Sequence, residues 1–410
     1  MNLLGEKCSL EVSKNCSLYF SGYNNYPTNH KITNNSIINF ENFNNTKELT
    51  TFMLNEKLYT RLLVETDFLD NPNALQFSDL EMIYLFVHNK KDMNEKKNRM
   101  TNTKQEYLRD LLIIYKQLLE NLTTFQIKLS YQVLGHAPSL FQSLTHSNLR
   151  KYQEWLLTAP LGKGGKPYAA ATLNRKMIIL KSFLSYLYIN EYIKIPLHEK
   201  MLSSNVRDAD IPNRDLSSNE VLQLLDYFKG HPILHCFIAV LSTTGLRIRE
   251  LCSSRISDIT YQDGDYWLNV MGKGRKQREV LLHPNIIEEI RLFRIRRRLE
   301  FKLDTTDDSP IFTTATGNPY NYKYLSNYLT KHINKADITF IKIRRTPITP
   351  HFLRHAYAII SAENGATLES ISPSLGHSSY RTTARYLEKR LSRKNSASHT
   401  WKNSNIINSL

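Results

Sequence analysis

The chain contains few cysteines and none of the spacings that build a metal site or a disulfide framework. Its four cysteines are Cys8, Cys16, Cys236 and Cys252, and no two of them form a Cys-x-x-Cys pair. We therefore expect neither a disulfide scaffold nor a bound metal. No stretch reaches the roughly 18 apolar residues of a membrane span, and the N-terminus lacks a basic segment followed by an apolar one. A cytoplasmic protein with no membrane partner is the resulting expectation.

A glycine-rich loop at residues 161–167 lacks the pattern of a nucleotide site. It reads Leu-Gly-Lys-Gly-Gly-Lys-Pro, and Pro167 stands where a Walker loop requires a serine or threonine that binds magnesium. The sequence therefore indicates no nucleotide cofactor. Lys163 and Lys166 make this a basic loop, and both DNA-backbone contact and simple solvation remain open for it.

Acidic residues are fewer than basic ones. The 410 residues include 54 Lys and Arg against 38 Asp and Glu, a formal net charge of +16. Because contacts to phosphates provide most of the non-specific affinity for nucleic acids, this excess favours a polyanionic partner. A basic protein without such a partner is the alternative that charge alone leaves open.

Composition and periodicity predict two main domains. Residues 1 to about 50 are rich in asparagine and poor in pattern, so we expect weak or local order there, within an N-terminal extension placed at residues 1–72. Residues 73–205 are predicted to form a helical domain, followed by a linker at 206–213. The second domain is expected at 214–395, and a polar tail at 396–410.

Apolar residues spaced by three and four predict two long helices in the first domain, over 103–122 and 170–190. Three basic residues of the second helix are predicted to lie off its apolar stripe: Arg175, Lys176 and Lys181. At these positions they would face either DNA phosphates or solvent.

The second domain begins helical and then changes to strands. Ser217 and Glu220 fit a capping box at the start of a helix. Asp263-Gly264 is a hairpin turn signal, and the segments on both sides of Gly272-Lys273-Gly274 are rich in strand formers. The predicted fold class is mainly α: a helical domain plus a mixed α/β domain with a small three-stranded antiparallel sheet.

Groups suited to phosphodiester chemistry gather in the second domain: Arg247, Lys273, His351, Arg354, His377 and Tyr386. Planar guanidinium groups match the oxygens of a phosphodiester, so the two arginines are predicted to clamp it. A phenol has a pKa near 10 and needs a proton acceptor to attack, for which His351 is the candidate. Each residue also has a structural alternative, such as an arginine paired with Glu250 or a solvated lysine on a turn.

Four segments in order resemble the tyrosine recombinases, or phage-type integrases, over residues 100–395. They are Thr244-Gly245-Leu246-Arg247 with Glu250, Gly272-Lys273-Gly274 followed by Lys276 and Arg278, His351-Phe352-Leu353-Arg354, and Leu375-Gly376-His377 with Tyr386. The resemblance implies that residues 73–205 are a core-binding (SAM-like) domain and residues 214–395 the catalytic domain. Pro373, just before the last segment, departs from the pattern and predicts a reshaped turn.

The resemblance also implies residue roles. Tyr386 would be the nucleophile, with Tyr380 as the rival that spacing disfavours, and Glu250 would orient Arg247. Lys273 would protonate the departing 5′ oxygen, and His377 would bind the phosphate. Its neighbours Arg275 and Lys276 are predicted to contact DNA, and together with Arg278 they leave the identity of the proton donor open.

The implied function is site-specific DNA recombination through a covalent 3′-phosphotyrosyl intermediate and a Holliday junction. The expected partners are duplex recombination sites, three further copies of the chain in a tetramer, and accessory DNA-bending or directionality proteins. A mobile-element integrase, a tyrosine-type transposase and a resolvase of chromosome dimers all fit. A type IB topoisomerase and a catalytically silent DNA-binding relative remain the alternative functions, and the 1–72 extension is expected to bind separate arm sites or to lack order.

Overall fold

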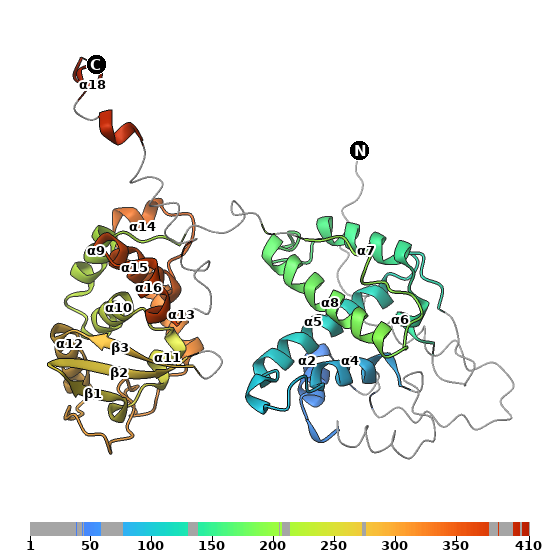
Figure 1. The fold of residues 1–410 in the computed structure, drawn as a ribbon, viewed down its shortest axis with the longest axis horizontal. Coiled ribbons are helices and arrows are strands. Elements are labelled where there is room, and N and C mark those ends of the chain that lie inside the picture. Colours follow the sequence, from blue (N-terminus) through green and yellow to red (C-terminus); the bar gives the residue numbers. More distant parts are fainter. Residues whose placement is uncertain are drawn as a thin grey trace, which may run out of the picture. The chain divides into compact units, whose positions relative to one another are not determined.

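We describe the chain from a computed structural model, in which residues 38, 43, 45–58, 77–129, 138–204, 206, 214–272, 276–376, 384, 397–401 and 404–409 are described. The chain divides into two compact units, Met1–Ile211 and Pro212–Leu410 (Figure 1). Each unit has its own hydrophobic core. No helix in the described ranges combines the length and apolar character needed to cross a membrane.

The first unit is built from helices. They are α2 (Thr46–Met53), α4 (Asp79–His88), η3 (Glu95–Lys97), α5 (Thr101–Glu120), α6 (Leu140–Ser143), α7 (His146–Thr158) and α8 (Ala170–Ile189). Helix α5 packs against α2, α4 and α8, which bury its apolar stripe. The two long helices predicted from apolar spacing are thereby confirmed, each within two residues at either end.

Helix α2 begins within the segment, residues 1 to about 50, for which weak or local order is expected. Asn45 caps the helix by accepting hydrogen bonds from the backbone of Lys47 and Glu48. Leu49 and Met53 are fully buried in the core of the first unit. At least this part of the predicted extension therefore belongs to the helical unit.

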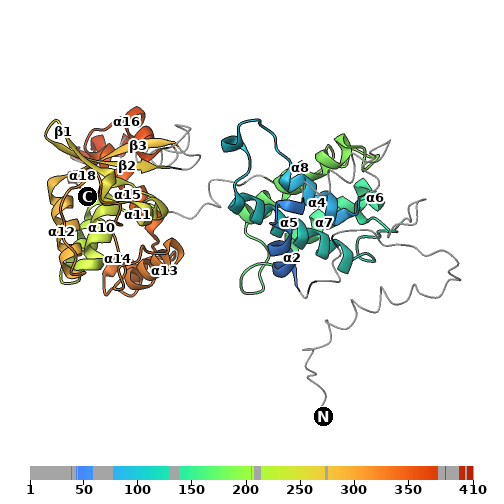
Figure 2. The same ribbon diagram turned by 90° about the horizontal axis from the view of Figure 1, so that it is seen from below.

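The second unit combines helices with one small sheet. Its helices are α9 (Ser218–Phe228), α10 (Pro232–Thr244), α11 (Ile248–Ser253), η5 (Ile256–Asp258), α12 (Pro284–Arg296), α13 (Tyr322–Ile333), α14 (Thr339–Ile343), α15 (Pro350–Glu363), α16 (Leu368–Leu375), η6 (Ala397–Trp401) and α18 (Asn405–Asn408). Helix α10 packs against α9, α12, α15 and strand β3 (Gln277–Leu282). Figure 2 shows α10 within this unit. The predicted capping box is present, because Ser217 and Glu220 cap the start of α9 reciprocally.

The sheet has the order β1-β2-β3 and is antiparallel throughout, with β1 at Ile259–Gln262 and β2 at Asp265–Met271. Asp263 and Gly264 both have positive φ, 53° and 90°, as a two-residue hairpin turn requires. The mainly α fold with a three-stranded antiparallel sheet is therefore confirmed. Residues 273–275, which join β2 to β3, lie outside the described residues.

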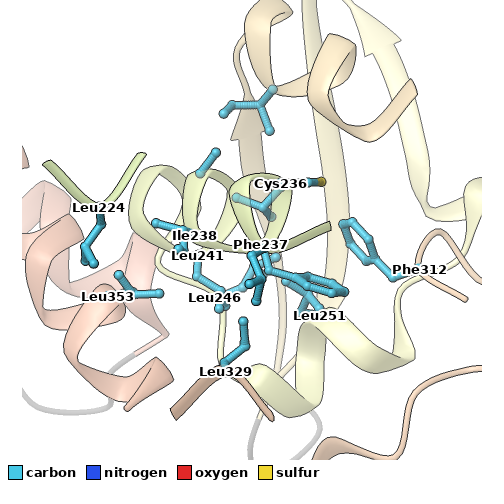
Figure 3. Packing of buried hydrophobic residues seen from close by; sticks show 14 of the residues in the cluster. Leu224, Cys236, Phe237, Ile238, Leu241, Leu246, Leu251, Phe312, Leu329 and Leu353 are labelled. Carbon is cyan, nitrogen blue, oxygen red and sulfur yellow. The ribbon is translucent and has the colours of Figure 1, made fainter. Parts of the chain in front are cut away.

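Figure 3 shows how α10 organises the core of the second unit. Phe237 packs against the rings of Phe293 and Phe312 at centroid distances of 5.4 and 5.3 Å. Phe237 and Phe312 are labelled in Figure 3. Leu241 and Leu246, on the two sides of the end of α10, are buried with Leu353 of α15. This packing fixes the end of α10 relative to α15, and the candidate site lies at that junction.

Candidate active site

The site begins where α10 ends. Gly245 terminates the helix in the left-handed region, with φ 61°. A Cβ added there would lie 2.7 Å from Tyr357 Cδ1 and 2.8 Å from Leu375 Cδ2, so glycine is required for space as well as for φ. The tight turn delivers Arg247 to the start of α11.

Glu250 holds Arg247 at this helix start. Its carboxylate accepts one hydrogen bond from the Arg247 backbone N–H at 2.8 Å and another from Nη1 at 2.7 Å. Burial raises the pKa of the Glu250 carboxyl, but the hydrogen bonds from Arg278 and Arg247 outweigh it and hold the pKa below its ordinary value. Glu250 is therefore ionised, and it orients a guanidinium whose side chain remains 30% exposed.

Arg354 lies one turn into α15 and is 2% exposed. Its Nη1 donates to the carbonyl of Gly245, and its Nη2 donates to the carbonyl of Leu375. One side chain thus joins the ends of α10 and α16. The Nη2 of Arg247 donates to the next carbonyl, that of Gly376, at 3.4 Å. The two arginines therefore converge on consecutive residues at the end of α16.

The end of α16 has the local structure that this convergence needs. Gly376 caps the helix in the left-handed region, with φ 62°. Pro373 lies inside α16, which continues to Leu375, so the proline does not end the helix. The last carbonyls of a helix lack partners within it and carry partial negative charge, which arginine donors satisfy.

His351 lies one turn before Arg354 at the solvent-accessible start of α15. Desolvation by surrounding atoms lowers the pKa of His351 to about 4, and the positive charges of Arg214, Arg354 and Arg247 act in the same direction. The imidazole is uncharged at neutral pH, the state in which it can accept a proton. Its ring stands edge-on to that of His355, with centroids 4.6 Å apart.

The structure thus brings together Arg247, Glu250, His351 and Arg354. Four further predicted residues lie outside the described residues: Lys273, Arg275, His377 and Tyr386. Two of these adjoin described positions, since His377 directly follows Gly376 and Lys273 directly follows Gly272. Lys276, also predicted to contact DNA, is exposed.

The DNA-binding candidates of the first unit differ in their surroundings. Lys163, Lys166 and Lys181 are exposed. The side chain of Arg175 is 40% exposed and pairs with Glu106 at 3.1 Å and with Asp110 at 3.0 Å.

Lys176 requires a correction. It was predicted off the apolar stripe, but it is 3% exposed on the buried face of α8. Its ammonium pairs with the buried Asp110 at 3.0 Å. In this structure it therefore cannot reach DNA from the surface.

Two arginines near the site interact with its residues in ways that the sequence did not indicate. Arg214 is close enough to His351 to lower its pKa, and no pattern in the sequence marks it. Arg278 pairs with Glu250 at 2.8 Å and is 9% exposed on its side chain. The alternation of side chains along β3 could have predicted that Arg278 faces inward, because Val280 and Leu282 on the same face are buried.

No group of three or more His, Cys, Asp or Glu side chains that could hold a metal ion occurs within the described ranges. The groups that do converge here have an excess of positive charge: the guanidiniums of Arg247, Arg278 and Arg354, the single ionised carboxylate of Glu250, and the uncharged imidazole of His351. Such a site is suited to an anion with several oxygens.

Comparison with known proteins agrees with this chemistry. The sequence model of the phage integrase family matches residues 214–393. Tyrosine recombinase XerC of Myxococcus xanthus is 27% identical over 302 residues, which cover 72% of this chain and 90% of the relative. Tyrosine recombinase XerD of Staphylococcus saprophyticus is 30% identical over 226 residues, covering 53% of this chain and 72% of the relative.

Among solved structures, a lambda integrase tetramer bound to a Holliday junction has a TM-score of 0.54. The identity is 14%, and the likeness covers 82% of this chain and 84% of that one, so it shows the shared fold. The chain belongs to the tyrosine recombinase family. It is a site-specific recombinase, an enzyme that breaks and rejoins DNA strands, and a topoisomerase or a silent relative is not favoured.

Proposed function

We propose that this recombinase cleaves one DNA strand with Tyr386 as the nucleophile. The phenol oxygen would form a bond to the scissile phosphorus while the bond from phosphorus to the 5′ oxygen breaks. His351 would accept the phenol proton, and Lys273 would donate a proton to the leaving 5′ oxygen. The products are a 3′-phosphotyrosyl linkage and a free 5′ hydroxyl. Because the linkage is still a phosphodiester, rejoining needs no nucleotide cofactor.

Arg247 and Arg354 would bind the non-bridging oxygens of the scissile phosphate, where negative charge grows in the transition state. The observation that carries the proposal is their convergence on the carbonyls of Gly376 and Leu375. His377 is the residue that follows Gly376 in the chain. His377 would then add a hydrogen bond to the same phosphate.

Duplex DNA is the proposed partner. The net charge of +16 favours a polyanion, and the exposed Lys163, Lys166, Lys181 and Lys276 would contact its backbone. Two further arginines complete the set of residues predicted to bind DNA: Arg175, whose guanidinium is partly paired with carboxylates, and Arg275. By analogy with the lambda integrase tetramer on a Holliday junction, four copies would act on two DNA sites and exchange strands in turn. Accessory DNA-bending proteins, and arm-site binding by part of residues 1–72, belong to the same proposal.

Apolar side chains near the C-terminus would contribute to that assembly. Trp401, Ile406 and Ile407 are 55%, 64% and 45% exposed. An exposed aromatic residue, followed five residues later by two exposed aliphatic ones, is suited to anchoring in a pocket of a neighbouring copy. Gel filtration with target DNA would compare the full chain with one that ends before Trp401; equal tetramer assembly by the shortened chain would contradict this role.

Covalent trapping tests the chemistry. Wild type and Tyr386→Phe are incubated with nicked suicide substrates made from the DNA that flanks the gene, and denaturing gels reveal protein–DNA adducts. We expect an adduct in wild type and none in Tyr386→Phe. An adduct that survives the substitution would move the role to another residue, with Tyr380→Phe as the next variant. Tight specific DNA binding without any wild-type adduct would contradict the proposal.

A further inference from the structure

Arg278 uses every nitrogen of its guanidinium to join two elements of the second unit. Nη1 and Nη2 donate to the two carboxylate oxygens of Glu250 at 3.1 and 2.8 Å. Nε donates to the carbonyl of Ser374 at 2.9 Å. Strand β3 is thereby tied to α11 on one side and to the end of α16 on the other.

The fork geometry suits this task in a way that an ammonium does not. A guanidinium is rigid and planar, so two of its nitrogens can meet one carboxylate while the third points elsewhere. Among the hydrogen bonds to Glu250, that from Arg278 lowers the pKa of the carboxyl most. The ionised Glu250 then binds both the backbone and the side chain of Arg247.

Two glycines leave room for the Arg278 side chain. A Cβ at Gly376 would lie 3.2 Å from Arg278 Nη1, and a Cβ at Gly272 would lie 3.2 Å from the same atom. These glycines directly precede His377 and Lys273. One buried guanidinium is therefore packed between the starts of the two segments that carry those residues.

Three successive carbonyls at the end of α16 each accept from a different arginine. Arg278 donates to the carbonyl of Ser374, Arg354 to that of Leu375, and Arg247 to that of Gly376. Only Arg278 among the three has both Nη atoms on a buried carboxylate, with 9% of its side chain exposed and 4% of that of Glu250. A guanidinium does not give up its proton in proteins, and these nitrogens are committed to a buried carboxylate, so Arg278 is not suited to be the proton donor.

We propose that Arg278 is a positioning residue of the recombination reaction. It fixes Glu250, and through it Arg247, against the segments that lead into His377 and Lys273. The inference rests on the proposed function, because it assumes that those three residues act on the scissile phosphate. Arg278 itself does not touch DNA, so its loss should slow cleavage without weakening DNA binding.

The test is single-turnover cleavage of a suicide substrate at saturating DNA, with affinity measured separately. In Arg278→Ala we expect the cleavage rate constant to fall by about 100-fold, as misplaced catalytic groups typically cause. We expect the DNA dissociation constant to stay within about threefold of wild type. Arg278→Lys keeps a cation beside Glu250 but lacks the fork, and we expect it to recover less than about a tenth of the lost rate.

Arg294→Ala is the matched control. Arg294 is also buried and donates to backbone carbonyls, those of Glu300 and Pro310 at 2.8 Å each, in the α12 region. Its loss should lower stability while leaving the rate constant of the folded, DNA-bound fraction unchanged. Thermal melts of all variants give that folded fraction.

These measurements distinguish a positioning role of Arg278 from a structural one. Rate constants of Arg278→Ala and Arg294→Ala that match after correction for folding would make Arg278 merely structural and overturn the inference. Should Arg278→Ala not fold, the same comparison with Arg278→Lys decides. A wild-type adduct alongside unimpaired Arg278 variants would sink this inference alone, whereas no wild-type adduct would remove the proposed function and this inference with it.

Discussion

The guanidinium of Arg354 donates a hydrogen bond to the carbonyl of Gly245, which lies 109 residues earlier in the chain. The bond joins the first turns of α15 to the end of α10, two residues before Arg247. Since Arg354 also holds the carbonyl of Leu375, the relative placement of three chain segments depends on one buried side chain. Gly245 makes this junction possible, because its backbone is left-handed and it carries no Cβ.

Gly245→Ala is therefore expected to be costly. A positive φ costs an ordinary residue about 1 to 2 kcal/mol, and overpacking adds about 1 to 3 kcal/mol. The new methyl would lie 2.7 Å from the ring of Tyr357. We expect the free energy of unfolding, measured by urea denaturation, to fall by about 2 to 5 kcal/mol. Gly317→Ala is the control, because Gly317 has φ 79° but no atom within 4 Å of its added Cβ; equal losses would contradict the steric argument.

The buried pair of Asp110 and Lys176 gives a second prediction, on stability of the first unit. Removing one partner of a buried ion pair costs about 3 to 5 kcal/mol, because the other charge stays buried without compensation. Asp110→Ala should lower the free energy of unfolding by that amount, and Asp110→Ala/Lys176→Met should recover part of it. Glu120→Ala is the control, since Glu120 pairs with Lys116 at 3.5 Å on the surface. A double variant no more stable than Asp110→Ala would refute the coupling.

Stability should also depend on pH through His351. The pKa of its imidazole is lowered to about 4 in the folded protein, from an ordinary value of 6.5. Between these values the unfolded chain binds the proton and the folded chain does not, so this contribution to stability falls as the pH drops below 6.5. We expect wild type to lose more stability than His351→Gln between about pH 7 and about pH 5. Parallel pH profiles for the two proteins would show that the pKa of His351 is not lowered.

The sequence predicts two long helices, the start of α9 and the β1–β2 hairpin, for local physical reasons. Apolar spacing placed α5 and α8, the Ser217 capping box placed the start of α9, and Asp263-Gly264 placed the β1–β2 turn. Each of these signals lies within a few residues of the structure that it determines. The same locality explains why α2 was missed: its buried residues are few and lie in a segment of polar composition.

Side-chain pairing over long distances is what the sequence could not show. Lys176 lies on the buried face of α8 with Leu180, Phe183 and Leu187, but a lysine in a sequence predicts an exposed position. Its partner Asp110 is 66 residues away, and only the packing of α5 on α8 brings them together. Arg278 was similarly grouped with the loop cations beside Lys273, although its strand face points inward. The sequence segments that resemble the recombinase family identified Arg247, His351 and Arg354. The carbonyls to which the two arginines donate are brought to them only by the assembled fold.

The exposed lysines of the first unit give a final prediction, on DNA affinity. Each lysine that neutralises a phosphate releases a counterion, so the slope of log affinity against log salt changes by about 0.9 per contact. Lys163→Ala, Lys166→Ala and Lys181→Ala should each reduce the magnitude of that slope by about 1 and weaken binding to all sequences alike. Lys116→Ala is the control, because Lys116 is 50% exposed but paired with Glu120. Lys176→Met should leave the slope of the folded protein unchanged, since its ammonium is buried against Asp110. Fluorescence anisotropy across a salt series measures all five variants, and an unchanged slope in the first three would assign these lysines to solvent and leave the contact with DNA to other side chains.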